Sequence, residues 1–158
     1  MLDDSLKAQL KSYLERVTKP FERLVELAKQ TAIGNAAAIK DAEIRQRLVK
    51  IAGSVAALTY SSYRQTSLAA RGEDPGLIQL LFKLYGTNVG HDIAQCARDL
   101  MGDSFMLAPM AEGGRSDGVE KWNNQYMGSI AIAIAGGASN IQRNIIAERG
   151  LGLPRTSD

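Results

Sequence analysis

The residues with the clearest capacity for chemistry lie in the C-terminal stretch GGASNIQR, residues 136–143. A Gly-Gly pair ends one predicted helix, and Ser139 with Gln142 three residues later has the form of a capping box that begins the next. The first N–H groups of a helix lack intrahelical partners and point outward, so this start would suit an anion such as a pyrophosphate. A plain helix-to-helix turn has the same pattern, and the residues alone favour that simpler interpretation.

A second candidate is a polar row along the helix predicted over residues 76–101. Its members are Asn88, His91, Gln95 and Arg98. The row lies beside an apolar stripe, so it is either a solvated face or a surface aimed at a partner. A lone histidine on a helix is usually an ordinary polar residue, and Cys96 falls within the apolar stripe, where a thiol belongs to the core. We assign no catalytic role to either side chain.

The common chemical signatures are absent. The sequence contains no GxxxxGK phosphate loop and no GxGxxG, HExxH, GxSxG or CxxC motif. One histidine and one cysteine cannot supply a His/Cys zinc cage, so we predict no metal site. No acidic pair shares an apolar surface, which leaves paired-carboxylate catalysis without candidates.

The elements that must position these residues are helical, because apolar residues recur every three to four positions and strand-like alternation is almost absent. We predict an all-α antiparallel bundle in which Pro20 separates an extra N-terminal helix from the next. A loop or weak linker is expected at 34–38, and residues 102–118 should form a functional or mobile connection without a helix. The predicted helices cover residues 2–18, 21–31, 41–71, 76–101, 118–135 and 140–149.

Two predicted helices carry well-defined apolar stripes. In the first, small residues beside the stripe, including Gly53, Ala56 and Ala57, would allow close approach of a neighbour and favour self-association. The stripe over 41–71 consists of Ile44, Leu48, Ile51, Val55 and Leu58. The stripe over 76–101 consists of Ile78, Phe82, Tyr85, Val89, Ile93, Cys96 and Leu100.

Composition limits the class of protein. The chain has 158 residues with 45% hydrophobic, 23% charged and 6% aromatic content, which suits one globular domain. Its net charge of +2 and few aromatic residues argue against nucleic acid as a partner. No run of eighteen apolar residues predicts a membrane span, the polar start is no secretory signal, and the single Cys96 fits a reducing compartment. We therefore expect a cytoplasmic protein.

The C-terminal stretch resembles the acyl-CoA dehydrogenase family, whose last helix follows a turn of the form Gly-Thr-Ser/Asn-Glu/Gln-Ile-Gln-Arg and ends in Glu-Arg with a Gly-Leu-Pro-Arg tail. Residues 136–143, the Glu148-Arg149 pair and residues 152–155 match this pattern. The likeness continues upstream through residues 21–30, 45–48 and 71–76 and Lys83. It covers about residues 21–155 and implies the family's C-terminal four-helix domain.

The resemblance assigns FAD-binding positions. In the family the turn approaches the flavin pyrophosphate, which points to Gly137, Ala138 and Asn140, although Ala138 lacks the hydroxyl of the usual threonine. A second family element, Gln-x-x-Gly-Gly-x-Gly, reaches the FAD of a neighbouring subunit. Its counterpart here begins at Arg98 and keeps only Gly102 of the glycine pattern.

The resemblance supplies no catalytic residue. The family abstracts a proton beside the thioester carbonyl and transfers a hydride to flavin, so it needs a carboxylate base. Many members have a glutamate immediately before the turn, where this chain has Gly136. Other members carry the base in a Leu-Glu-Arg run on an earlier helix, but Glu15 and Glu22, which superficially match, do not occupy that helix of the family.

The first twenty residues resemble instead the N-terminus of the flavoprotein subunit of alkyl hydroperoxide reductase, so we divide the chain into a foreign-looking leader at 1–20, the helical domain at 21–155 and a tail at 156–158. The function implied is that of the C-terminal domain of an acyl-CoA dehydrogenase, an oxidoreductase of fatty acid metabolism. This domain would contribute FAD contacts and pack against copies of itself or other domains and subunits of such enzymes. Alone it would be inactive and retain no FAD. The alternative is a non-enzymatic helical module for self-association or protein interaction.

Overall fold

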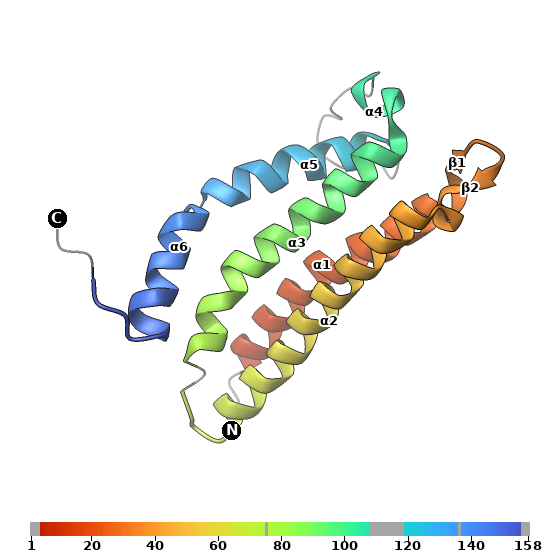
Figure 1. Ribbon diagram of the computed structural model, residues 1–158. Coiled ribbons are helices and arrows are strands. Elements are labelled where there is room, and N and C mark those ends of the chain that lie inside the picture. Colours follow the sequence, from red (N-terminus) through yellow and green to blue (C-terminus); the bar gives the residue numbers. More distant parts are fainter. Residues whose placement is uncertain (1–3, 75, 108–118, 136, 156–158) are drawn as a thin grey trace.

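The computed structural model describes residues 4–74, 76–107, 119–135 and 137–155, and α3 (Leu77–Met101) is the helix around which the others pack. On one side lie α1 (Asp4–Gln30) and α2 (Ala42–Ala70), which run antiparallel to each other (Figure 1). On the other side lies α5 (Val119–Ile134), followed by α6 (Ser139–Ile145) and a π-helical turn, η2 (Ile146–Gly150). The predicted all-α bundle is confirmed.

Pro20 does not divide α1, which corrects the prediction of separate helices at 2–18 and 21–31. A proline inside a helix loses one hydrogen bond and costs roughly 3 kcal/mol. Val17 and Leu24 lie buried on the same stripe, one on each side of Pro20, and burying each contributes about 1.5–3 kcal/mol. The continuous helix keeps both side chains in the core, so tertiary packing offsets the local cost.

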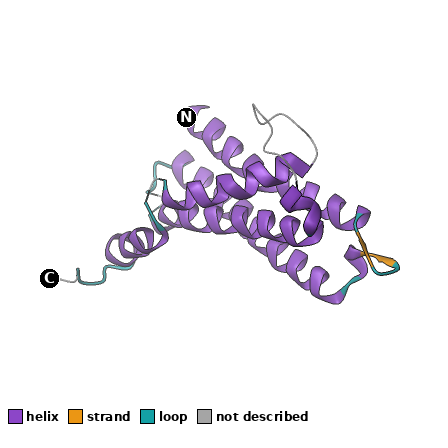
Figure 2. Ribbon diagram, turned by 90° about the horizontal axis from the view of Figure 1, so that it is seen from above, coloured by secondary structure: helices purple, strands orange, loops and turns teal. Residues whose placement is uncertain are grey.

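The expected linker at 34–38 is mostly a β-hairpin. The strands β1 (Ala32–Ile33) and β2 (Ala36–Ala37) pair antiparallel, and a 3₁₀ turn, η1 (Ala38–Lys40), follows them (Figure 2). Gly34 has φ +57° at the first position of the two-residue turn, which is the glycine position of a type II′ hairpin. Asp41 then begins α2, because its carboxylate accepts hydrogen bonds from the N–H groups of Glu43 and Ile44 at 2.9 and 3.0 Å.

The apolar stripe predicted for α2 is buried as expected, and it packs with α1 and α3 into one core. The α3 stripe is also buried over most of its length, but Tyr85 is 52% exposed. Tyr85 sits at the edge of this stripe, and the next residue along the chain, Gly86, is buried instead.

The predicted connection at 102–118 contains a short helix, α4 (Asp103–Leu107), where no helix was expected. Gly102, at φ +52°, ends α3, and α4 follows at once. Phe105 is buried and meets the ring of Tyr126 edge to face, with 5.7 Å between ring centroids. This tertiary contact stabilises α4, although the sequence there lacks the apolar repeat of a helix. The remainder of the connection, residues 108–118, lies outside the described residues.

Candidate functional site

The five predicted FAD-binding residues fall into two groups at different levels of α3. Arg98 and Gly102 lie at its C-terminal end. Gly137, Ala138 and Asn140 follow α5 close to Ile132, whose carbonyl accepts a hydrogen bond from Lys83 Nζ at 2.8 Å. Arg98 lies fifteen positions after Lys83 on α3, which is about 22 Å along the helix axis. One chain therefore does not bring the two groups together (Figure 1).

The turn before α6 depends on glycine. Gly137 has φ +101°, and a Cβ added there would lie 2.8 Å from Nε2 of Gln142. The predicted capping box is wrong, because α6 begins at Ser139 with Ala138 as its N-cap and no side-chain hydrogen bond caps the helix. Ser139 is one residue too far along the chain to cap, and Gln142 lies against Gly137 instead. Gly136 lies outside the described residues.

The absent cap matters for ligand chemistry. The N-cap Ala138 has no side chain that could accept from the first N–H groups of α6, so among the described residues the cap itself leaves these donors facing outward, as an oxygen ligand would require. The Asn140 side chain is engaged locally, since its Oδ1 accepts a hydrogen bond from Arg143 Nη1 at 3.1 Å. Arg143 adds positive charge beside the turn. The group at Gly137 thus fits the phosphate oxygens of a dinucleotide through backbone donors, without the hydroxyl that Ala138 lacks.

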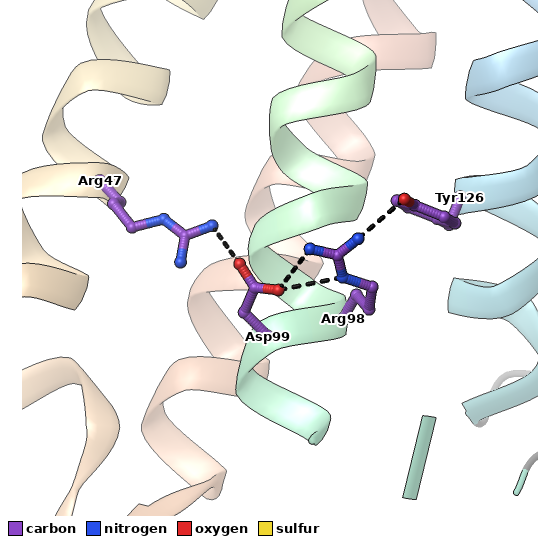
Figure 3. Close-up of polar contacts among 4 residues, drawn as sticks. All are labelled: Arg47, Arg98, Asp99 and Tyr126. Atoms are coloured by element: carbon purple, nitrogen blue, oxygen red, sulfur yellow. Dashed lines mark hydrogen bonds and ion pairs between the residues drawn. The ribbon is translucent and has the colours of Figure 1, made fainter. Parts of the chain in front are cut away.

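The group at the other end of α3 is organised by an ion-pair network (Figure 3). Asp99 Oδ1 accepts hydrogen bonds from Nε and Nη2 of Arg98 at 3.0 and 2.8 Å, and Asp99 Oδ2 accepts one from Nη2 of Arg47 at 2.8 Å. Nη1 of Arg98 donates to the Tyr126 hydroxyl at 2.8 Å. These bonds link α2, α3 and α5 and hold Arg98 in place.

The network changes the acidity of its members. Burial alone would raise the pKa of Asp99, but the hydrogen bonds and charges of Arg98 and Arg47 outweigh it and hold that pKa below its usual range. The hydrogen bond to Asp99 raises the pKa of Arg98. Asp99 is therefore an anion that orients two arginines, and it is no candidate for a proton carrier near neutral pH.

The polar row of α3 turns out to face α5 in part. His91 Nδ1 lies 2.9 Å from Ser129 Oγ, and Ser129 Oγ donates to the Tyr126 carbonyl at 2.6 Å. Because the Ser129 proton is used in that bond, we assign the His91 proton to Nδ1, which then donates to Ser129. In this arrangement Ser129 accepts from His91 instead of donating to it. Asn88 is exposed, as the solvated interpretation expects, whereas His91 and Arg98 are half-buried and contact α5 through Ser129 and Tyr126.

An apolar groove between α1, α3 and α5 was missed from the sequence. Its volume is about 710 Å³, which lies within the range of pockets that bind small molecules. Gly90 on α3 and Gly128 on α5 widen it, since a Cβ on either would meet nothing within 4 Å. The signal in the sequence was the small-residue spacing of Gly86 and Gly90 on one helix. The groove is lined by Arg16, Val17, Pro20, Gln79, Phe82, Lys83, Gly86, Thr87, Gly90, Gln125, Gly128, Ser129 and Ile132.

The groove offers binding surface and little reactivity. The Thr87 hydroxyl donates to the Lys83 carbonyl at 2.7 Å, and the Ser129 hydroxyl donates to the Tyr126 carbonyl.

Within the described ranges no three His, Cys, Asp or Glu side chains gather as a metal site would require. No helix in those same ranges is long and apolar enough to cross a membrane.

Comparison with known proteins gives a consistent answer. Residues 12–151 match the family profile described as "Acyl-CoA dehydrogenase, C-terminal domain". The chain is 35% identical over 140 residues to acyl-CoA dehydrogenase IpdE1 of Mycolicibacterium smegmatis, covering 89% of this chain and 32% of that protein. The IpdE1 of Mycobacterium tuberculosis is 35% identical over 138 residues, covering 87% and 32%. The chain thus spans about a third of the length of these relatives.

Solved structures share the fold. The crystal structure of the ChsE4-ChsE5 complex from Mycobacterium tuberculosis matches with a TM-score of 0.71 at 18% identity, over 90% of this chain and 37% of that one. The FAD complex of PigA matches with a TM-score of 0.71 at 20% identity, over 89% and 34%. The profile match begins at residue 12, so it includes part of residues 1–20, which we predicted to be a separate leader.

Proposed function

The chain belongs to the acyl-CoA dehydrogenase family through its C-terminal domain, and we propose that it supplies this helical domain to a flavin-dependent enzyme that dehydrogenates acyl-CoA thioesters. The observation that carries the proposal is the match over residues 12–151 to a domain whose curated relatives are acyl-CoA dehydrogenases about three times as long. A cytoplasmic location and assembly with further copies or subunits are part of the same proposal.

In this proposal FAD supplies the redox chemistry when bound, and this chain contributes contacts from two places. Gly137, Ala138 and Asn140 would meet the pyrophosphate through the uncapped start of α6. Arg98 and Gly102 would approach the flavin of a neighbouring subunit. The separation of about 22 Å along α3 supports two different flavins, because the two groups lie too far apart for one shared phosphate site.

We further propose that the isolated chain is inactive. Gly136 carries no carboxylate, Asp99 is held as an anion by two arginines, and the Ser129 hydroxyl donates to the Tyr126 carbonyl and not to His91. In this proposal the apolar groove between α1, α3 and α5 binds an apolar surface of another domain or of a ligand.

The test is an FAD titration of the purified chain, followed by its visible absorption spectrum, and an anaerobic assay with short-, medium- and long-chain acyl-CoAs, added FAD and an artificial acceptor. We expect no retained flavin and no turnover above a boiled control. Gly136→Glu should stay inactive, since one positioned base contributes only about 10² to 10⁴ in rate and cannot replace a flavin. Turnover by the unmodified chain would overturn the inactivity.

A non-enzymatic interaction module is the second candidate function, and one observation favours it. No charged residue occurs between Lys121 and Arg143, and several large apolar side chains in and beyond this stretch are exposed. Exposed apolar surface of this kind is typical of sites covered by a protein partner. A full-length family member of the same organism that forms a stable, flavin-free complex with this chain would favour this candidate over the enzymatic one.

A further inference from the structure

The apolar groove between α1, α3 and α5 has one closed end and one open end. At the closed end the guanidinium of Arg23 on α1 lies 4.7 Å from the centroid of the Trp122 ring on α5. Both residues lie about one helical turn beyond the nearest groove residues of their helices, which are Pro20 and Gln125. The contact therefore joins α1 to α5 at this end, and the groove separates the two helices beyond it, with α3 between them (Figure 1).

The charged side chains that line the groove are both positive. They are Arg16 on α1 and Lys83 on α3, and no aspartate or glutamate of the described residues lines it. Lys83 Nζ donates one hydrogen bond, to the Ile132 carbonyl at 2.8 Å, and its other protons meet no carboxylate in the part of the chain that the structure describes. Arg16 is exposed and has no ion pair within that same part. The groove therefore selects an anionic ligand.

Both charges lie toward the open end of the groove. Arg16 precedes Pro20 by about one turn on α1, so it lies farther than Pro20 from the closed end. Lys83 is bonded to Ile132, which follows Gln125 by about two turns on α5 and so lies toward the same end. The groove therefore has positive charge at its mouth and leads from there along α3 to its closed end.

The interior of the groove suits an apolar chain. The hydroxyls of Thr87 and Ser129 both donate to backbone carbonyls, so neither offers a proton to a ligand. Gln79 and Gln125 are uncharged, so they do not select the sign of a ligand. A polar group placed along the interior would lose its bonds to water without full replacement, whereas an apolar chain loses none. The buried apolar residues of the lining are Val17, Phe82 and Gly86.

We propose that the groove binds a free medium-chain carboxylic acid, with its carboxylate at Arg16 and Lys83 and its chain along α3. Lys83 and Gly90 lie about 10 Å apart along the helix axis, a length that an extended chain of about eight to ten carbons spans. The carbonyl of an acyl-CoA thioester is uncharged, so the two cations favour the free acid over the thioester. This inference rests on the proposed function only in taking the groove as a ligand site.

Calorimetric titration of the purified full chain with decanoate below its micelle concentration tests the site. Trp122 is the only tryptophan of the sequence, and its emission gives a second signal because its ring borders the closed end. We expect one site with a dissociation constant of roughly 10–300 μM. No heat and no change of emission at millimolar decanoate would overturn the site. The titration contains no FAD and the flavin test contains no decanoate, so failure of one proposal is distinguishable from failure of the other.

Filling the groove tests where the ligand lies. A Cβ at Gly128 meets nothing within 4 Å, and leucine favours a helix over glycine, so Gly128→Leu should fold and weaken decanoate binding roughly tenfold or more. Gly90→Leu, from the α3 side of the groove, should do the same. Ala131→Leu is the matched control, because it lies exposed on α5 outside the lining, and it should bind as the wild type does. Two filled variants that are helical by circular dichroism and bind like this control would overturn the proposal.

The head group is tested with decanoate, decanol and decanoyl-CoA. The wild type should bind decanoate about fivefold more tightly than decanol, and this ratio should fall toward one in the double variant Arg16→Gln/Lys83→Gln. Sodium chloride should lower the same ratio by screening the charges. Decanoyl-CoA should behave like decanol. Equal affinities of the wild type for decanoate and decanol would overturn the carboxylate. Tighter binding of decanoyl-CoA than of decanoate would assign the groove to the thioester and overturn the proposal as well.

Discussion

Replacing Asp99 with asparagine should lower the free energy of unfolding by about 1 kcal/mol at neutral pH. The side chain accepts three hydrogen bonds from Arg47 and Arg98, and it joins α2 to α3. A hydrogen bond to a charged group contributes about 1.5–3 kcal/mol when buried, whereas an exposed ion pair contributes about 0–1 kcal/mol. The side chains of Arg47, Arg98 and Asp99 are 31–36% exposed, so we expect a loss close to the range of an exposed ion pair.

The loss should depend on pH with a definite sign. The folded pKa of Asp99 lies below its ordinary value, so the unfolded chain takes up this proton first as the pH falls. The stabilisation is then fully present above the unfolded pKa of about 3.9 and disappears as the pH falls through the lower folded value. The difference between the wild type and Asp99→Asn should stay constant from about pH 8 to pH 5 and shrink below about pH 4.

Urea denaturation followed by far-UV circular dichroism measures these differences, provided that the slope with urea stays unchanged. Asp92→Asn, an exposed carboxylate on the same helix, is the control and should change stability by less than about 0.5 kcal/mol. A double-mutant cycle with Arg47→Gln should show a coupling of about 0.5 kcal/mol. An Asp99→Asn protein as stable as the wild type, or a loss that persists unchanged at pH 3, would refute the reasoning.

Three further substitutions or reagents probe other parts of the chain. Leu24→Ala, at a side chain that is 0% exposed, should destabilise the fold by about 2–5 kcal/mol in the same urea assay, whereas Val49→Ala on the surface should cost less than about 0.5 kcal/mol. Gly137→Ala should cost about 1–2 kcal/mol and lower the melting temperature, because φ is +101° and the new Cβ meets Gln142; an unchanged melting temperature would contradict this turn geometry. Cys96 should react with a thiol reagent only on unfolding, since burial excludes the reagent and raises the pKa of the thiol; fast reaction in native buffer would argue against the packed core.

The candidate flavin residues show where prediction from the sequence stopped. The resemblance named Gly137, Ala138 and Asn140, and the positive φ of Gly137 agrees with a turn that needs glycine. The local pattern misplaced the helix start by one residue: it predicted Ser139 as the N-cap, but Ala138 is the N-cap and Ser139 is the first residue of α6. That Arg98 donates a hydrogen bond to Tyr126 could not be predicted from spacing, since Tyr126 lies 28 positions away on another helix.

The sequence by itself determined the helical class, the buried stripe of α2, most of that of α3 and the family, because these depend on residues three or four positions apart or on a contiguous motif. Only the tertiary structure decided that α1 continues through Pro20, that His91 and Arg98 face α5, and that the groove beside α3 stays open. Each of these results depends on partners far apart in the chain, whose contacts outweigh local preference. The periodicity of a helix specifies which side is buried, but the packing of neighbouring helices decides what that side meets.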